Sequence, residues 1–261
     1  MRRLLLHLGD QATSFIGAVG GVSLLAFQAF YYAALPPYSF RLILRQLDYI
    51  GVKSLSIIGV AAVFTGLVLA LQTVYGLARF GAKAYVGIIV GLSMVRELGP
   101  VLTALLVGGR VGSGITAELG SMKVTEQIDA MRALGTSPIK KLVVPKVLGT
   151  MLVLPLLTVV ASVVGILGGM VISLYEFHVD PHLYMNSVLR SLKVADLLSG
   201  TGKTVFFGFI IAIVGCYQGL EVKGGTEGLG RATTTTVVTS SVLILISDFF
   251  LTKFFWWLEG W

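Results

Sequence analysis

The chain has 261 residues and a net charge of +7, with 55% hydrophobic and only 13% charged residues. Soluble domains carry about 25% charged residues, so this composition excludes an ordinary soluble domain. The positive charge does not indicate nucleic-acid binding, because a basic groove needs polar or aromatic neighbours on a soluble surface. The composition predicts an all-α polytopic membrane protein, since open β-sheets cannot satisfy their backbone hydrogen bonds in lipid.

The first apolar segment is closed by Pro36-Pro37. We interpret residues 1–35 as an N-terminal helix that lies at the membrane interface or re-enters the membrane, and residues 36–261 as a separate membrane-spanning domain. Arg2 and Arg3 place the N-terminus in the cytoplasm by the positive-inside rule.

A membrane-spanning helix needs about 20 predominantly apolar residues, and five later segments meet this requirement. We expect these spans at about residues 47–78, 84–115, 141–175, 200–221 and 232–257. An external loop is expected from Glu176 to about Asp196, and the glycine-rich turn Lys223–Gly230 joins the last two spans. The chain then crosses the membrane five times and ends outside the cytoplasm.

A charged, helix-forming segment separates the second and third spans. Apolar residues recur there at helical spacing with polar residues on the other side, which predicts a short amphipathic helix at about 121–134. The apolar positions are Val124, Ile128, Met131 and Leu134, and the polar positions are Lys123, Glu126, Gln127, Asp129 and Arg132. Gly135 and Pro138 mark its C-terminal end. Basic residues cluster around the segment, which places it in the cytoplasm.

Four pairs of glycines within the predicted spans are spaced four residues apart. They are Gly87 and Gly91, Gly108 and Gly112, Gly165 and Gly169, and Gly215 and Gly219. Small residues at this spacing let helices approach closely in lipid. We expect most of these pairs to pack within one subunit rather than between two.

Arg96 and Glu97 form an adjacent charged pair near the middle of the second span. Ionised groups at this depth cost about 2.5–3.5 kcal/mol each unless they are paired or hydrated. Adjacent side chains project about 100° apart on a helix, so each needs a separate partner or a wet cavity. Lys203 and Asp248, in the fourth and fifth spans, are the expected partners. The pair is either a functional site or a structural ion-pair network.

Two short motifs imitate known sites without completing them. Ser199–Thr204 is similar to a phosphate-binding loop, but the full motif needs glycine at the position of Leu197 and a preceding strand. His178 and His182 have plausible metal-ligand spacing, but Pro181 interrupts any helix that would align them, and no Cys or Glu cluster completes a site. We therefore expect no metal site and no cofactor in this chain, and we do not expect an enzyme.

The segment from Arg96 to Ser113, continuing to Pro138, strongly resembles the MlaE (YrbE-like) permease family. The likeness extends from about residue 45 to 255 and includes Leu154-Pro-Leu-Leu157. Members of this family are the membrane subunits of ABC transporters that move phospholipids or related lipids between membranes. The resemblance implies the same function here, between the inner and outer membranes of a bacterium.

The resemblance also implies an assembly. It indicates a homodimeric permease in the inner membrane, with five spans and an N-terminal interfacial helix. A separate ATPase subunit would bind ATP and Mg²⁺ and receive the helix at 121–134 as a coupling helix, and an MCE-domain lipid-binding protein would lie on the outer face. The implied lipid-cavity residues are Arg96, Glu97, Lys203, Asp248, Leu69 and Leu77, and the implied coupling residues are Lys123, Val124, Glu126, Gln127, Asp129, Met131 and Arg132.

Two alternatives from other functional classes stay open. The first alternative to the ABC permease is an ion-coupled secondary carrier that uses the intramembrane charges. The second is a scaffold that anchors an outer lipid-binding assembly without transporting lipid. Sensitivity to uncouplers without dependence on an ATPase would favour the carrier. Lipid movement that survives disruption of the charged residues would favour the scaffold.

Overall fold

The computed structural model describes residues 2–35 and 40–258, and the regular elements in these ranges are all helical. Three of them, η2, η3 and η4, are single wide π-helical turns, and η1 is a 3-10 turn. The elements are α1 (Arg2–Ala34), α2 (Phe40–Ala78), η1 (Lys83–Tyr85), α3 (Val86–Ser93), η2 (Met94–Leu98), α4 (Gly99–Val107), η3 (Gly108–Gly112), α5 (Ser113–Val124), α6 (Gln127–Ala133), η4 (Ile139–Val143), α7 (Val144–Tyr175), α8 (Pro181–Ser191), α9 (Val194–Leu220) and α10 (Gly225–Leu258).

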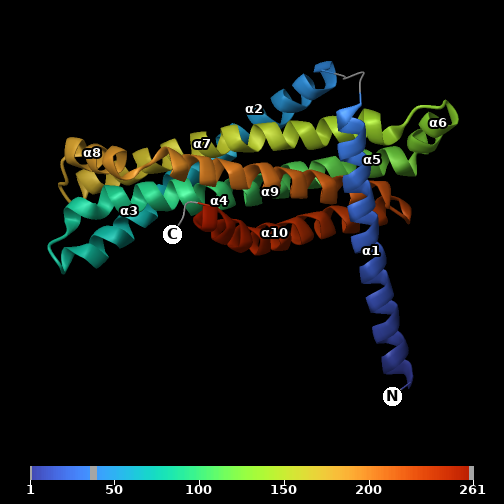
Figure 1. The fold of residues 1–261 in the computed structure, drawn as a ribbon, viewed down its shortest axis with the longest axis horizontal. Helices are drawn as coiled ribbons and strands as arrows, with labels where there is room; N and C mark the ends of the chain where they lie inside the picture. Colours follow the sequence, from blue (N-terminus) through green and yellow to red (C-terminus); the bar gives the residue numbers. More distant parts are fainter. Residues whose placement is uncertain (1, 36–39, 259–261) are drawn as a thin grey trace.

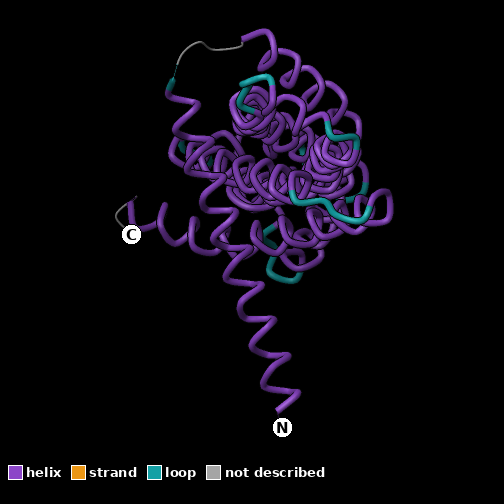
Figure 2. Tube along the Cα trace, turned by 90° about the vertical axis from the view of Figure 1, so that its right-hand side faces the viewer, coloured by secondary structure: helices purple, strands orange, loops and turns teal. Residues whose placement is uncertain are grey.

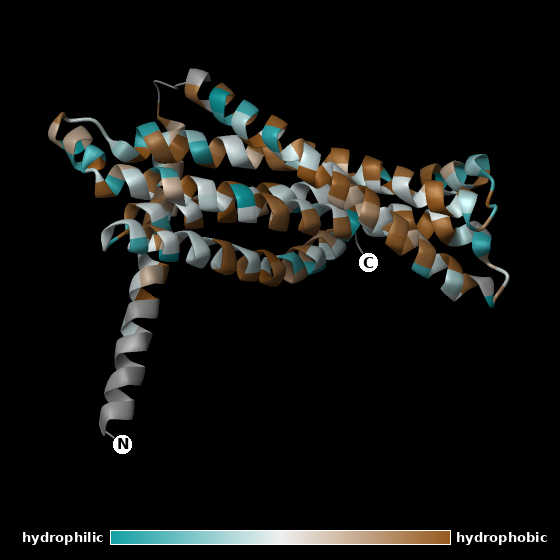
Figure 3. Ribbon diagram, turned by 180° about the vertical axis from the view of Figure 1, so that it is seen from behind, coloured by the Kyte–Doolittle hydropathy of each residue, from teal (hydrophilic) through white to brown (hydrophobic). Residues whose placement is uncertain are grey.

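Six stretches in the described ranges are long and apolar enough to cross a membrane. They are Ile16–Ala34, Leu44–Leu77, Val86–Val124, Ile139–Tyr175, Val194–Leu220 and Gly225–Leu258. The last five coincide with the five expected spans, and the first lies in α1. Hydrophobic residues dominate the middle of the bundle and hydrophilic residues gather toward its two ends (Figure 3). The predicted all-α polytopic membrane protein is confirmed.

Helix α1 is oriented differently from the rest of the bundle. The helices from α2 to α10 that form the expected spans run along the long axis, whereas α1 crosses one end of the bundle at a steep angle (Figures 1 and 2). It contacts α7, α9 and η4 and buries Leu25 and Ala29 against them. If the other helices cross the membrane along the long axis of the bundle, α1 is steeply inclined to the direction in which they cross it. Its interfacial placement stays a prediction, and Pro36-Pro37 lies outside the described residues.

Several predicted boundaries were wrong. The second span is longer than expected, because α5 continues it without interruption to Val124. The last helix begins at Gly225 rather than near residue 232, so only the first part of the glycine-rich segment is a turn. Gly224 and Gly225 both have positive φ angles in that turn, 85° and 65°, which explains the need for glycine there.

The loop expected between Glu176 and Asp196 contains the helix α8. Asp180 caps this helix by accepting a hydrogen bond from the backbone N–H of His182 at 2.8 Å. Pro181 therefore begins a helix rather than interrupting one, because proline is tolerated at the first helical position, where its missing N–H is not needed. Tyr184 and Val188 are buried, and they face Gly87 and Gly91 of α3.

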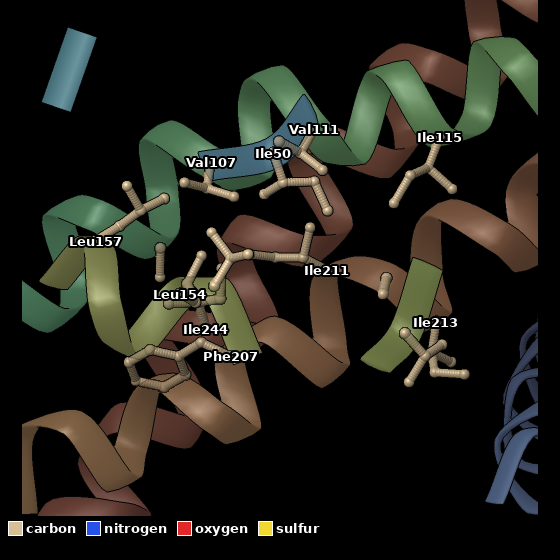
Figure 4. Packing of buried hydrophobic residues seen from close by; sticks show 14 of the residues in the cluster. Ile50, Val107, Val111, Ile115, Leu154, Leu157, Phe207, Ile211, Ile213 and Ile244 are labelled. Atoms are coloured by element: carbon tan, nitrogen blue, oxygen red, sulfur yellow. The ribbon is translucent and has the colours of Figure 1, made fainter. Parts of the chain in front are cut away.

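The core is built where the expected spans cross one another. Buried aliphatic and aromatic side chains from α2, α4, α7, α9 and α10 meet in one cluster (Figure 4). Figure 4 labels Ile50, Val107, Val111, Ile115, Leu154, Leu157, Phe207, Ile211, Ile213 and Ile244 in this cluster. The paired glycines lie at close helix contacts within the subunit, with Gly87 and Gly91 against α8. A Cβ on Gly215, for example, would lie 3.0 Å from the carbonyl oxygen of Gly112.

The ends of the bundle provide a test of topology. Helix α6 lies at one end, near the turn between α9 and α10, and α8 and η1 lie at the other (Figure 1). Because α10 runs from the α6 end toward the opposite end, we expect an alkaline phosphatase fused to the C-terminus to be active. A fusion at Gly135, after α6, should be inactive. A C-terminal fluorescent reporter that works in the cytoplasm would instead mean six crossings.

Candidate functional site

Lys203 is the centre of a buried charge cluster inside the bundle. The residue is fully buried in α9. Its ammonium group lies 2.7 Å from a carboxylate oxygen of Glu97 and 3.2 Å from one of Asp248. It also donates hydrogen bonds to the Thr252 hydroxyl at 2.6 Å and to the Arg96 carbonyl oxygen at 3.1 Å. The structure thus brings the three predicted residues Glu97, Lys203 and Asp248 together, in contacts between η2, α9 and α10.

Arg96 has a different partner from those expected. Its guanidinium forms an ion pair with Asp196, which is almost fully buried at the start of α9. Asp196 also accepts a hydrogen bond from the backbone N–H of Lys193 at 2.7 Å, so it caps α9 as well. Asp196 was expected at the end of the external loop and not among the partners of Arg96, so that expectation was wrong. Its spacing was informative, because a residue seven positions before Lys203 lies on the same face of a helix.

Local backbone geometry positions the two charged pairs. Arg96 and Glu97 lie in η2, the π-helical turn, which carries an extra residue and changes the direction of its side chains. Helix α9 passes close to this turn, since a Cβ on Gly200 would collide with the carbonyl oxygen of Val95. Gly200 belongs to the segment that imitates a phosphate loop. That segment lies within α9, and its glycine has a packing role.

A cleft of about 530 Å³ opens beside the charge cluster. Glu97, Asp248 and Thr252 supply its polar side. The other lining residues are Leu245, Phe249, Lys253 and Trp256. A charged edge next to an apolar wall can accommodate an amphipathic molecule, and the carboxylates are held by Lys203 rather than left unpaired.

The two leucines assigned to the acyl-chain wall lie in different surroundings. Leu69 lines a second groove of about 380 Å³, which also includes Leu98, the neighbour of Glu97 in sequence. Phe64, Thr65, Val68 and Gln72 complete this groove. Leu77 is half-buried near the end of α2 and packs in the cluster around Tyr184 rather than in the groove. The geometry connects Leu69, but not Leu77, with the charge cluster.

At the α6 end, the predicted amphipathic helix at 121–134 is not continuous. Lys123 and Val124 form the end of α5, and α6 begins only at Gln127. The break lies at Glu126, whose φ of 59° is left-handed and stops the helix. The helical spacing of the apolar residues continues across the break, and the sequence pattern therefore predicted one continuous helix. Gly135, with a φ of 71°, ends α6 as expected.

The apolar side of this segment remains largely uncovered by its own chain. Ile128 is fully buried, but Leu134 is 83% exposed and Val124 is 42% exposed. Asp129 forms an ion pair with Lys123 at 2.9 Å, which joins α6 to the end of α5, and a second pair with Arg132 at 3.2 Å within α6. The tip therefore presents both exposed apolar groups and exposed charged groups.

The same ion pairs affect the titration of Asp129. The hydrogen bond from Lys123 lowers the pKa of this carboxyl; desolvation opposes this shift, and the charges of Lys123 and Arg132 add to it. A lowered pKa in the folded state stabilises α6 above the ordinary pKa of aspartate, and this contribution is lost as the pH falls through the folded-state value. The carboxylate is therefore ionised at neutral pH, so its ion pair with Lys123 is present there.

Comparison with known proteins identifies the family. The family described as permease MlaE matches residues 43–254 of the chain. This chain belongs to the MlaE permease family. A probable ABC transporter permease protein of Rickettsia conorii is 43% identical over 226 residues, 87% of each chain. The intermembrane phospholipid transport system permease protein MlaE of Haemophilus influenzae is 35% identical over 227 residues, again 87% of each chain.

A third relative is also described as a transporter permease. A probable ABC transporter permease protein of Synechocystis is 42% identical over 190 residues, 73% of this chain and 72% of its own length. These names describe a transporter component rather than an enzyme. The chain is therefore a multi-pass membrane permease of the ABC transporter class.

Proposed function

We propose that this MlaE-family permease moves phospholipids or closely related lipids between the inner and outer membranes of a bacterium. In this proposal two copies form the membrane unit, a separate ATPase docks at the α6 end and supplies ATP hydrolysis, and an MCE-domain protein binds at the α8 end. The name of the Haemophilus influenzae relative supports the substrate class. The exposed apolar side of the segment from Val124 to Leu134 supports docking of the ATPase.

The observation that carries the proposal is the charge cluster beside the apolar cleft. A phospholipid needs hydrogen-bond donors for its phosphate and apolar surface for its acyl chains. Arg96 can supply paired donors through its guanidinium, which a lysine cannot reproduce. The side chain of Arg96 is 29% exposed, so part of it is accessible although it pairs with Asp196. Leu245 and Phe249 line the cleft beside Glu97, the neighbour of Arg96 in sequence, and Leu69 lines the second groove beside Leu98.

Dimerisation is supported by the surface of α10. The buried residues of α10 within the subunit are Thr236, Ser240 and Ile244. Its exposed residues include Val242, Leu245, Ile246 and Phe249, next to the cleft. A second copy packed near this surface would enclose the cleft, which is open in one subunit.

The proposal is tested by lipid bound to the purified native complex. We expect mass spectrometry to find co-purifying phospholipid and an ATPase subunit. Arg96→Ala should reduce phospholipid per folded dimer several-fold, because it removes the bidentate phosphate donor. Arg96→Ala combined with Asp196→Ala serves as the control for folding, since it removes the stranded carboxylate as well.

The outcomes separate the proposal from its alternatives. Wild-type lipid occupancy in a destabilised Arg96→Ala dimer would show that the ion pair is only structural. Transport that stops with an uncoupler but continues without the ATPase would identify an ion-coupled carrier. Lipid movement that survives loss of the charge cluster, with the complex intact, would identify a scaffold.

A further inference from the structure

A second group of cations lies on the α6 side of the bundle, away from the cluster around Lys203. The ammonium group of Lys53 lies 4.5 Å from the ring centroid of Tyr49, and the guanidinium carbon of Arg110 lies 5.7 Å from the same centroid. Arg110 belongs to the π-helical turn η3, and Lys53 and Tyr49 belong to α2. One aromatic ring thus holds two positive charges within the apolar part of the chain.

No carboxylate neutralises these two cations. Within residues 2–35 and 40–258, neither Lys53 nor Arg110 forms an ion pair, and Asp48, the acid beside Tyr49 in sequence, forms none either. A cation inside a span is expensive unless an anion or water accompanies it. The arrangement differs from the cluster around Lys203, where carboxylates balance the positive charges.

The donors at this position are only partly used. Arg110 donates one hydrogen bond, at 2.6 Å, to the hydroxyl of Ser54, which is fully buried. A guanidinium has five N–H donors, so others are free to meet an anion, and its planar fork suits a phosphate. Lys53 is exposed and Tyr49 is 44% exposed, so the position is open from the side of α2.

An exposed apolar stripe leads away from the two cations along α2. Lys53 is followed at helical spacing by exposed apolar residues, which lie on the same face of the helix. They are Ile57, Val60, Phe64 and Val68, between 45% and 63% exposed. The last two line the groove beside Leu98, near the charge cluster. From Lys53 to Val68 the rise is about 22 Å, more than half of the roughly 30 Å hydrocarbon core.

We propose that Tyr49, Lys53 and Arg110 form a clamp for the phosphate of a phospholipid from the cytoplasmic leaflet, with its acyl chains along the stripe on α2. A phosphate supplies the missing anion, and the stripe supplies apolar contact for the chains. An acidic protein segment would satisfy the charges but not the apolar residues beyond them. The course of the acyl chains rests on the proposed lipid transport, whereas the clamp is defined by its own charges.

The experiment is site-specific cross-linking in native membranes that contain the whole complex. A photoreactive amino acid replaces Ile57, one turn from Lys53, and the cross-linked product is analysed for phospholipid. We expect a lipid adduct that falls roughly tenfold in Lys53→Gln and in Arg110→Gln, since each variant removes charge-assisted hydrogen bonds to phosphate. Lys83→Gln, an exposed lysine in η1 at the other end of the bundle, is the matched control and should not change the adduct.

Several results would overturn the clamp. A lipid adduct that is unchanged in both Lys53→Gln and Arg110→Gln would show that the cations do not hold lipid. An adduct to the ATPase or to a second copy of the chain would identify a protein as the occupant. Saturable binding of inorganic phosphate that Lys53→Gln abolishes, with an unchanged lipid adduct, would assign the position to free phosphate. Because Lys53 is exposed, its substitution separates these outcomes from misfolding, and the adduct does not depend on whether transport occurs.

Discussion

Lys203→Met is expected to abolish lipid transport and to lower the free energy of unfolding of the permease by about 3–5 kcal/mol. The ammonium group of Lys203 is the shared partner of Glu97 and Asp248, and it is fully buried. Its removal leaves two carboxylates close together without their cation, at the edge of the cleft, where Asp248 is 19% and Glu97 is 39% exposed. The yield of folded protein and its thermal midpoint in detergent measure the structural part of the effect, and transport in reconstituted vesicles measures the functional part.

A triple variant separates the two parts. Lys203→Met with Glu97→Gln and Asp248→Asn removes the stranded charges, so we expect stability to recover by most of the loss. Transport should stay absent, because the polar edge of the cleft no longer carries its charges. Recovery of transport together with stability would show that the cluster only holds η2, α9 and α10 together.

Arg132→Glu combined with Leu134→Asp is expected to reduce co-purification of the ATPase by more than tenfold, with the permease still folded and inserted. Leu134 is the most exposed apolar residue of the cytoplasmic tip, and the side chain of Arg132 is 60% exposed beside it. A few central apolar and arginine residues usually dominate an interface, so the loss of two should separate the partners. The measurement is the ratio of ATPase to permease after affinity purification.

The control for this prediction is Arg231→Glu. Arg231 lies near the start of α10, at the same end of the bundle, and its side chain is 74% exposed. Its substitution by glutamate reverses the charge as Arg132→Glu does. It should leave ATPase binding unchanged. Normal co-purification and normal transport in the Arg132 and Leu134 double variant would remove α6 from the proposed coupling interface.

The parts of the fold that depend on local pattern could be predicted from the sequence. Long uncharged segments indicated the spans, since the bilayer sets a minimum apolar length. The punctuation at Gly135 predicted the end of α6, because its backbone needs the left-handed conformation. Lys203 was a correct partner for Glu97, because a buried charge inside a span requires an opposite charge within another span.

Other features depended on contacts that no local pattern contains. Asp196 pairs with Arg96 across 100 positions of sequence, and its place near the end of a loop concealed it. Helix α8 begins at Pro181. From the sequence, a proline in a polar segment can mark either the start of a helix or the interruption of one. The left-handed turn at Glu126 was not predictable either, because glycine or asparagine usually occupies that conformation.

The π-helical turns have a consequence for how movement can pass along the protein. Each holds one residue more than an α-helix needs over the same length, so a change to α-helix rotates everything beyond it by about 100°. Both η2 and η3 lie between the outer end of α3 and the tip that carries α6. Such a change in η2 or η3 would therefore turn α4, which lies between them, relative to α2. Deleting a single residue from either turn would make that segment permanently α-helical. If transport depends on rotation of the helix, this variant should lose transport, whereas a movement by tilting alone should tolerate the deletion.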